Sequence, residues 1–565
     1  MYRIVLSLLM LCTGQLIMAQ SSELSALQQQ IAAKIGPVEG ARSAYTQAWS
    51  FDPATPDQVK LTVEETDKKK GKTETATYQF SLVDLDENLV RDETRRDLKF
   101  ITAGIGGKQK MVDVYENGEP QNYEDEVNIL VADSKAAREL QELLKNAIAL
   151  ARSQDKTRLQ FGSFEEMDIW LQDHIKDFKQ EDNYYMAAFK PSGSEKIIYD
   201  YNLRRRDSRN VDKFQYTFNL ADLDPNRIQL EVRGRSIAVN AKTERDQHFV
   251  TVFDDEQPDN FDDEINFPME SIAAARDLAA VLRMAIPEAV KLRTESLIPM
   301  DDLTAGLSDF SEQVRSFTQE GTTFDQKLDN GCLTTYQVQE TGSNGKTETA
   351  TYEWNLGDLG PDEVAIKVAG KDIYVVGEIK NGENLIQYFR DGEQRNYTDQ
   401  VDIRAEGVEN AKSLAFLLKQ IAKGCDEQQR QMLGGMEKDD PAAWIQSEVQ
   451  AFKDPSEPAY RQEIAIDRDN CSLVLTTVSP KGRGEEKMRY EVLLRNLDSA
   501  VFNPEVSGKE VLVELPTREG EDHIKTYKNE AVEKFTNSLQ IRVKDVAAAR
   551  SLIAVFWQLM EDCAE

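Results

Sequence analysis

The hydrophobic and polar positions of the chain follow two periods that alternate along the sequence. Several stretches place apolar residues at helical spacing, as at Ala136, Leu140, Leu143, Leu144 and Ala147. This spacing gathers the apolar side chains on one face and predicts an amphipathic helix. Other stretches alternate apolar and polar residues, as in 352–356 and 364–368, which is typical of strands with one buried face. The pattern therefore predicts helices and short strands within the same domains.

These elements recur at a fixed interval. The octapeptide Gly-Lys-Thr-Glu-Thr-Ala-Thr-Tyr occurs at 71–78 and again 274 residues later, at 345–352. Sets of equivalent residues share the spacings 138, 136 and 138: Tyr78, Tyr216, Tyr352 and Tyr490; Tyr123, Phe261, Tyr397 and Phe535; Leu140, Leu278, Leu414 and Leu552. Independent markers with one series of spacings indicate tandem copies of one structural unit. The sequence predicts four repeats.

Each predicted repeat spans about 137 residues and has an α+β composition. A connector helix comes first, about six antiparallel strands follow, and a C-terminal helix closes the repeat. The connector helices are identified by the apolar sets Trp170/Ile175/Phe178, Phe310/Val314/Phe317 and Trp444/Val449/Phe452. Tight turns between strands are predicted at Asn117-Gly118 and Asp391-Gly392. The predicted boundaries are 20–152, 156–292, 298–427 and 438–565, with linkers within 151–163 and 426–440.

The first twenty residues have the pattern of a secretory signal. Arg3 is followed by the apolar run 4–12 and by a short polar stretch that ends at Ala19. The apolar run is too short to span a bilayer, so we expect a signal peptide over 1–19 rather than an anchor. No later stretch approaches the length of a spanning helix. The mature protein is expected to be soluble and exported, in the periplasm or outside the cell.

The net charge of the chain argues against strongly anionic partners. The 565-residue chain has 100 acidic and 68 basic residues, which gives a net charge of −32. A phosphate backbone needs a basic footprint, so nucleic acid is excluded as the main partner. General adhesion to an anionic membrane is disfavoured for the same reason. Only three histidines occur, at 174, 248 and 523, which leaves little material for a histidine-built metal or triad site.

The order and length of the elements resemble the pleckstrin-homology-like barrel, in which a C-terminal helix plugs one end of a bent antiparallel sheet. The resemblance covers each repeat and rests on no diagnostic motif. A helix lying across one open sheet is the alternative. The signal, which ends in Ala-Gln, is similar to those of exported Bacteroidota proteins. Together these features suggest an exported multi-domain protein.

The cysteines of the mature chain follow the repeat. Cys332 and Cys471 occupy the first strands of the third and fourth repeats, and Cys425 and Cys563 end the closing helices of the same repeats. Four cysteines allow three pairings, and equivalent pairs in equivalent repeats favour Cys332–Cys425 and Cys471–Cys563. An exported protein lies in an oxidising environment where disulfides persist. A zinc or redox site is disfavoured because no Cys-x-x-Cys motif occurs.

The first hairpin of three repeats carries a basic cluster on an otherwise acidic chain. The candidate anion-binding residues are Lys68, Lys69, Lys70, Lys72, Arg204, Arg205, Arg206, Arg209, Lys481, Arg483 and Lys487. The resemblance to pleckstrin-homology domains implies an anion site here, because the corresponding hairpin often binds anionic headgroups. Clustered Arg and Lys can grip phosphate or carboxylate through charge-assisted bonds. The competing interpretation is solubilising charge on exposed hairpin tips.

Catalytic patterns are weak throughout the sequence. The stretch 342–347 lacks the glycine spacing of a phosphate loop, and the abundant carboxylates show no calcium-loop pattern. Asp84, Asp222 and Asp358 recur in a Leu-x-Asp-Leu turn where the fourth repeat has Asn496. Because Asn can replace Asp in an Asx turn but not as a general base, we interpret these residues as caps. His248 and His523 are interpreted as structural, and no metal or cofactor is expected.

The sequence favours a non-enzymatic binding or scaffold protein of the cell envelope that holds an envelope protein or an anionic surface ligand. The tandem repeats and the absence of a catalytic motif point to this interpretation. One alternative is a binder of anionic lipid or glycan through the basic hairpins. A second alternative is an extracellular hydrolase with a carboxylate pair, since such a site leaves no spacing signature.

Overall fold

The computed structural model describes residues 23–563 apart from 181–182, 193–194, 206–210, 255–256, 298–299, 301, 455–456 and 483. The predicted signal peptide lies outside these residues. The protein is α+β, as expected, with helices and several antiparallel sheets. It divides into two compact units, an N-terminal unit up to Leu297 and a C-terminal unit from Ile298. This division lies between the predicted second and third repeats.

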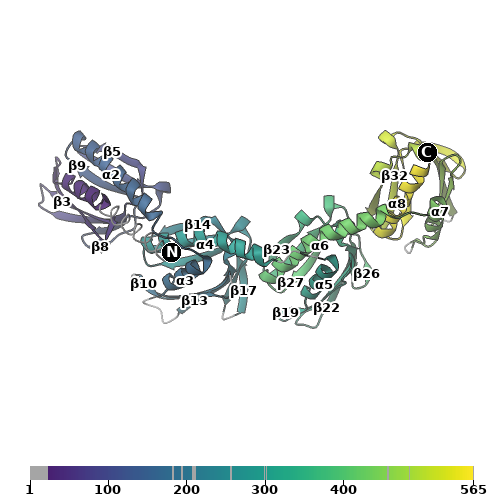
Figure 1. Cartoon of the computed structure of the whole chain (residues 1–565), viewed down its shortest axis with the longest axis horizontal. Coiled ribbons are helices and arrows are strands. Elements are labelled where there is room, and N and C mark those ends of the chain that lie inside the picture. The colour runs from purple at the N-terminus through teal and green to yellow at the C-terminus, as the bar shows by residue number, and fades with distance from the viewer. Residues whose placement is uncertain are drawn as a thin grey trace, which may run out of the picture. The chain divides into compact units, whose positions relative to one another are not determined.

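The first segment of the N-terminal unit, residues 23–155, begins with a helix over 23–34. It contains a six-stranded sheet of order β1-β2-β3-β4-β7-β8 and a three-stranded sheet of order β5-β6-β9. Figure 1 shows helix α2 lying against β5 and β9. The bounds are β1 Val38–Glu39, β2 Ser43–Asp52, β3 Thr55–Asp67, β4 Thr73–Ser81, β5 Leu85–Arg95, β6 Leu98–Ile105, β7 Asp113–Glu116, β8 Glu119–Pro120, β9 Glu126–Val131 and α2 Ser134–Asp155.

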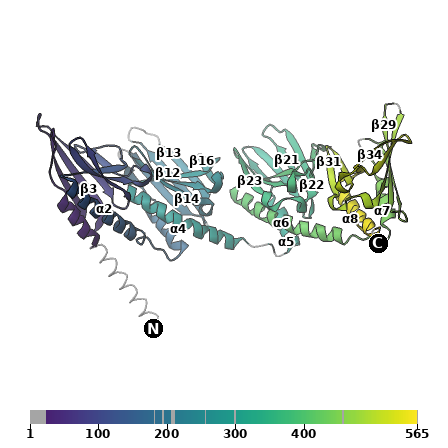
Figure 2. The ribbon, with the colours of Figure 1, turned by 90° about the horizontal axis from the view of Figure 1, so that it is seen from above.

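The second segment, residues 164–296, has the same arrangement. A large sheet of order β10-β11-β12-β13-β16-β17 accompanies a small sheet of order β14-β15-β18. Figure 2 shows α2 and α4 on the same side of the strands within the N-terminal unit. The bounds are α3 Phe164–His174, β10 Phe178–Gln180, β11 Asn183–Pro191, β12 Lys196–Arg204, β13 Val211–Asn219, β14 Leu223–Arg233, β15 Ser236–Thr243, β16 Val250–Asp254, β17 Gln257–Asp262, β18 Glu264–Met269 and α4 Ile272–Ser296.

The third segment, residues 303–434, opens the C-terminal unit. Its large sheet has the order β19-β20-β21-β22-β25-β26 and its small sheet the order β23-β24-β27. The bounds are α5 Leu303–Gln313, β19 Phe317–Gln319, β20 Thr322–Leu328, β21 Leu333–Thr341, β22 Thr347–Asn355, β23 Ala365–Ala369, β24 Asp372–Glu378, β25 Gln387–Arg390, β26 Glu393–Gln394, β27 Gln400–Ala405 and α6 Val408–Gly434.

The fourth segment, residues 441–562, completes the C-terminal unit. Its larger sheet has five described strands in the order β28-β29-β30-β33-β34, and its small sheet has the order β31-β32-β35. The bounds are α7 Pro441–Ala451, β28 Arg461–Asp467, β29 Ser472–Lys481, β30 Gly484–Leu493, β31 Asn503–Ser507, β32 Glu510–Pro516, β33 Ile524–Lys528, β34 Ala531–Thr536, β35 Ser538–Val543 and α8 Val546–Asp562.

The structure corrects several predicted elements. A segment has more strands than the six expected, because strands of two or three residues such as β1 and β8 are too short to show alternation. The connector helices also end sooner than predicted. Phe178 and Phe317 begin strands β10 and β19 rather than belonging to α3 and α5. Helix α6 continues to Gly434, through much of the predicted linker 426–440, because its Gln- and Glu-rich sequence favours helix.

The closing helix supplies much of the core of each segment. In α2 the residues Leu140, Leu144 and Ala147 of the predicted apolar stripe are buried, and Ala136 and Leu143 are half-buried against the same core. These side chains pack in one cluster with residues of the small sheet, including Ile101, Ala103, Val127 and Ile129. Aspartates cap the N-termini of α2 and α8, since Asp133 accepts from Ala136 N at 2.8 Å and Asp545 accepts from Ala548 N at 2.7 Å. The helix is thereby fixed in position on the sheet.

The two predicted tight turns join short strands of the large sheets. Asn117 and Gly118 have φ values of 51° and 86° between β7 and β8, and Asp391 and Gly392 have values of 52° and 79° between β25 and β26. Two consecutive residues at positive φ are the signature of the type I′ hairpin turn. Asn and Asp tolerate this conformation better than most side chains, which explains the Asn-Gly and Asp-Gly pairs.

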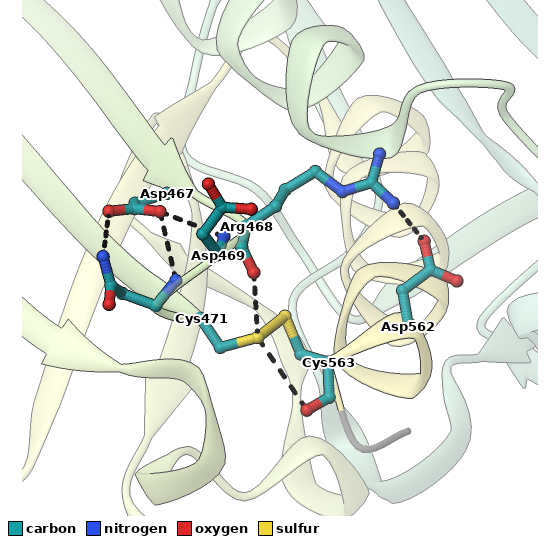
Figure 3. Close-up of a disulfide and its surroundings, with 7 residues drawn as sticks. Asp467, Arg468, Asp469, Cys471, Asp562 and Cys563 are labelled. Atoms are coloured by element: carbon teal, nitrogen blue, oxygen red, sulfur yellow. Dashed lines mark hydrogen bonds and ion pairs between the residues drawn. A yellow bond between two sulfur atoms is a disulfide. The ribbon is translucent and has the colours of Figure 1, made fainter.

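Two disulfides join the sheets of the third and fourth segments to their closing helices. Cys332 and Cys471 were predicted to lie in the first strands, but they immediately precede β21 and β29, the third and second strands of their segments. Cys332 bonds to Cys425 and Cys471 bonds to Cys563, with Cα–Cα distances of 5.4 and 5.8 Å. These are the pairings that the repeat predicts. Figure 3 shows the second bridge beside an ion pair at 3.3 Å between Arg468 and Asp562, which also connects the strand end to the helix. Both disulfides lie in the C-terminal unit.

Reduction is expected to loosen the C-terminal unit selectively. Each bridge closes a loop of more than 90 residues, so its loss costs ~2–5 kcal/mol of stability. Hydrogen–deuterium exchange with and without reductant should show faster exchange in 303–562 and unchanged exchange in 23–296, which contains no cysteine. Equal acceleration in both units, or none in either, would contradict this account.

Candidate binding grooves between consecutive segments

Each compact unit contains a groove where its second closing helix meets the large sheet of the preceding segment. The groove of the N-terminal unit, called the first groove, has a volume of about 440 Å³ and lies between β2–β4 and the start of α4. The groove of the C-terminal unit, called the second groove, has a volume of about 790 Å³ and lies between β21–β22, the end of α6 and the start of α8. Each groove is a feature of two consecutive segments.

The two grooves are built from equivalent positions. Residues 274 apart in the sequence line both, and the pairs are Phe80 and Trp354, Ser81 and Asn355, Asp84 and Asp358, Met111 and Leu385, Asp113 and Gln387, Tyr123 and Tyr397, Ile272 and Val546, and Arg276 and Arg550. The interval equals the spacing of the repeated octapeptide. The structure therefore places the same groove twice on the chain, once in each unit.

A buried ion pair joins the two segments at the first groove. Arg276 of α4 donates from Nε and Nη2 to the two carboxylate oxygens of Asp84, at 2.9 and 2.7 Å. The Asp84 side chain is only 6% exposed. Burial raises the pKa of Asp84, while the guanidinium acts in the opposite direction. A bidentate pair fixes the orientation of both side chains as well as their distance.

The second groove repeats this pair. Arg550 of α8 donates from Nη1 to one oxygen of Asp358 at 2.9 Å, and its Nη2 lies 2.7 Å from the other. Burial raises the pKa of Asp358, and Arg550 again opposes the rise. In the amide orientation that satisfies both of its polar ends, Gln429 accepts from Arg550 Nη1 and Nε at 2.7 and 3.1 Å. Arg550 is thus held on two sides.

Asp84 and Asp358 were predicted to cap their turns, but their carboxylates bind arginines instead. The cap comes from the residue three positions earlier, since Asn219 accepts from Ala221 N and Asn355 from Gly357 N, both at 2.8 Å. In the second segment, Asp222 lies 2.5 Å from Arg293. The earlier interpretation failed because the arginines lie far away in the sequence, 192 residues away for Asp84 and Asp358.

Further contacts join the two segments within each compact unit. In the N-terminal unit, Tyr123 belongs to the core cluster of the second segment, and Arg235 stacks over its ring with 4.6 Å to the centroid. Arg158 bonds to Asp277 at 2.9 Å. In the C-terminal unit, the backbone N–H of Tyr397 donates to Gly508 O at 3.0 Å. The groove walls are therefore fixed before any ligand arrives.

The predicted basic hairpins lie outside both grooves, and several of their cations pair with acidic side chains. On the β3–β4 hairpin, Lys68 lies 2.6 Å from Glu39 and Lys72 lies 2.5 Å from Glu74. The backbone N–H groups of Lys69 and Lys70 donate to Asp67. On the other hairpins, the contacts are Arg204 over Tyr184, Arg205 with Asp212, Lys481 with Glu486 and Lys487 with Glu530. Arg206, Arg209 and Arg483 lie outside the described residues, and anion binding here stays a prediction.

Within the described residues, one cluster of three side chains could hold a metal ion. A ring nitrogen of His248 and carboxylate oxygens of Asp262 and Asp263 lie within 4.8 Å of one another. Burial raises the pKa of Asp262, and the hydrogen bond that it accepts from the Asp263 backbone N–H opposes the rise. His248 is exposed, and its Nδ1 lies 3.2 Å from Phe261 O. The group lies apart from both grooves, neither of which has a histidine in its lining.

Comparisons of the chain with protein-family models, curated proteins and solved structures gave no match. Among the described helices, none is long and apolar enough to cross a membrane. The site was not visible in the sequence because a groove wall made by a second segment leaves no local motif. The signal that was available is the 274-residue interval, which relates Asp84 to Asp358 and Arg276 to Arg550.

Removing one member of the buried pair should destabilise the N-terminal unit. Asp84→Ala leaves the guanidinium of Arg276 without its partner in a largely buried position, and breaking such a pair costs ~3–5 kcal/mol. Urea denaturation should show this loss, with Glu74→Ala as a control. Glu74 pairs with Lys72 at the surface, where solvent screening leaves such pairs with little effect on stability. Equal effects of the two substitutions would refute the role of the buried pair.

Proposed function

We propose that the protein is a non-enzymatic, exported binding or scaffold protein of the cell envelope, and that the two grooves are its binding sites. The observation that carries the proposal is the repetition of one groove at equivalent positions in both units. Preformed concave sites between packed structural elements are where proteins commonly bind ligands. A second copy of the same site suits a protein that holds its partner at more than one place.

The organisation of the chain supports this proposal. Two sheets and a closing helix recur in four consecutive segments, which suits four tandem repeats of one domain. We infer that these are the domains predicted from the 138, 136 and 138 spacings. The pleckstrin-homology-like character of the domain belongs to the same proposal. It rests on the antiparallel sheets followed by a C-terminal helix in each segment.

The chemistry of the grooves favours binding over catalysis. In both grooves the buried carboxylate is already engaged by an arginine through two contacts. An acid that acts in catalysis must be able to exchange its proton with a substrate, which this arrangement opposes. The two disulfides support export, because such bonds persist in oxidising compartments.

A photo-cross-linking residue placed in the grooves tests this function. We expect that Lys60→benzoylphenylalanine in the first groove and Leu333→benzoylphenylalanine in the second capture defined molecules from the native envelope. Unlabelled mature protein should compete with this capture. The control is Phe535→benzoylphenylalanine, because Phe535 is an exposed aromatic residue on β34 outside both grooves. Capture no greater than from position 535 would reject the grooves as binding sites.

A further inference from the structure

We propose that the fourth segment binds the first segment of a second copy of this chain, so that copies associate head to tail. The contact uses the surface through which the first and third segments each bind the segment that follows. This inference goes beyond the proposed function, because the grooves concern envelope ligands and this surface concerns self-association. One face, which is covered in two segments and exposed in another, carries the inference.

In the first and third segments, this face lies at the end of the large sheet. Tyr123 and Tyr397 occupy equivalent positions after β8 and β26, and each is only 7% exposed. The turn between β14 and β15 covers the first of them, and there Arg235 Nη1 donates to Gln121 O at 2.9 Å. The turn between β31 and β32 covers the second, where Tyr397 N donates to Gly508 O at 3.0 Å. Both contacts use the same turn of the following segment.

The start of the following closing helix forms the other part of each contact. Arg276 of α4 binds Asp84, and Arg550 of α8 binds Asp358. The turn and the start of the helix are called the docking elements, and the surface that they cover is called the docking face. The same docking elements therefore cover the same docking face in both compact units.

In the fourth segment the docking face is exposed within the described residues. Phe535 follows Tyr397 by 138 residues and is 54% exposed, and Val532 of the same strand is 55% exposed. Both lie on β34, an edge strand that pairs with β33 and is exposed from Ala531 to Phe535. An exposed sheet edge with apolar side chains favours association with another chain. This face therefore has the surface of an interface and no partner segment among the described residues.

The first segment carries an exposed set of docking elements. Its turn between β5 and β6 places Arg96 and Asp97 at the positions of Gly234 and Arg235, and both are exposed. Arg96 and Gly234 have φ values of 59° and 61°, so the two turns share this backbone conformation. Arg138, at the position of the groove arginine of α4, is also exposed at the start of α2. A second copy of this chain therefore supplies both docking elements.

The charges of the two surfaces are complementary. In the N-terminal unit, Arg235 of the docking turn pairs with Asp113 of the docking face. Between copies, Asp97 takes the position of Arg235 and Lys525 takes that of Asp113. Both signs are exchanged, so the attraction is kept. Lys525 Nζ lies 4.9 Å from the ring centroid of Tyr527, beside the exposed strand, and opposite charges at such a place fix the register of an interface.

The contact between copies is weaker than the contact within a unit. Asn496 stands where the first segment has Asp84, so Arg138 meets a neutral amide instead of a carboxylate. Arg96 would lie near both Glu533 and Lys534, so its charge neither favours nor opposes the contact. A hydrogen bond to a neutral acceptor is weaker than one to a carboxylate. We therefore expect association that is reversible and depends on concentration.

Association also completes a third groove. In both compact units, the groove lies between a docking face and the start of the next closing helix. Val492 and Asn496 of the fourth segment occupy the positions of Phe80 and Asp84 in the first groove. The start of α2 from a second copy would close this half-groove. The third groove would thus be shared between two copies.

Sedimentation velocity of the mature full-length protein over a wide range of concentration tests the association. We expect the weight-average mass to rise with concentration. Lys525→Asp places a carboxylate beside Asp97 and should weaken association about tenfold or more. Adding Asp97→Lys to this variant restores the attraction and should bring the affinity back to within about threefold. The control is Lys346→Asp, the same charge change at a 70% exposed side chain between β21 and β22.

Cross-linking identifies the surface that is bound. Phe535→benzoylphenylalanine should link one copy to residues 96–98 or 134–138 of another. A mixture of isotope-labelled and unlabelled protein shows whether the linked peptides come from different copies. The mass of this product distinguishes it from captured envelope molecules, so position 535 still serves as the control for the grooves.

Several results would overturn the inference. They are a mass that is independent of concentration, equal effects of Lys525→Asp and Lys346→Asp, and no recovery in the double variant. Cross-links from position 535 that form only within one copy, or only to an envelope molecule, would also overturn it. The last of these would assign the docking face to a different partner. None of them bears on the grooves, which are tested separately from positions 60 and 333.

Discussion

A carboxylate and a guanidinium that are withdrawn from water hold consecutive segments together, and the rest of the site depends on this pair. Neither charge is tolerable alone at such depth, so Asp84 and Arg276 require the two segments to meet in one arrangement. Asp358 and Arg550 impose the same requirement in the C-terminal unit. The pair contributes geometry more than stability, since burial raises the pKa of both carboxylates against the effect of the arginines. That geometry creates the groove.

The two grooves share equivalent lining residues and differ in their walls. The arginine comes from the first turns of α4 or α8, whose start is fixed by Ser271 or Asp545 as helix cap. These elements are the same in both units and set the floor. In the second groove the extended α6 and the bridge from Cys332 to Cys425 supply a wall that the first groove lacks.

Much of the fold could be predicted from the sequence because its signals are local or periodic. The stripe of α2, the cap at Asp133 and the turn at Asn117-Gly118 each follow from a few neighbouring residues. The cysteine pairs were predictable because the repeat relates them. Helix ends were less accurate, since Phe178 fits the apolar face of a helix and of a strand equally well.

The site required information that no single repeat contains. Asp84 looked like a turn residue because its partner arginine belongs to another segment. Clustered lysines in the sequence predicted an anion site on the basic hairpins. The acidic partners of these lysines were not apparent, because some of them, such as Glu39 for Lys68, come from other strands. Exposure of Phe535 depends on packing and has no sequence pattern.

The most direct test of the central claim is carbene footprinting of the mature protein in native envelope extract, compared with the protein in buffer. Mass spectrometry then reports which residues become covered by bound molecules. The account predicts reduced labelling at the lining of the grooves, at 50–60 and 271–276 in the first and at 331–335, 428–433 and 545–551 in the second. Unchanged labelling at both grooves, with protection on other surfaces such as β34, would contradict it.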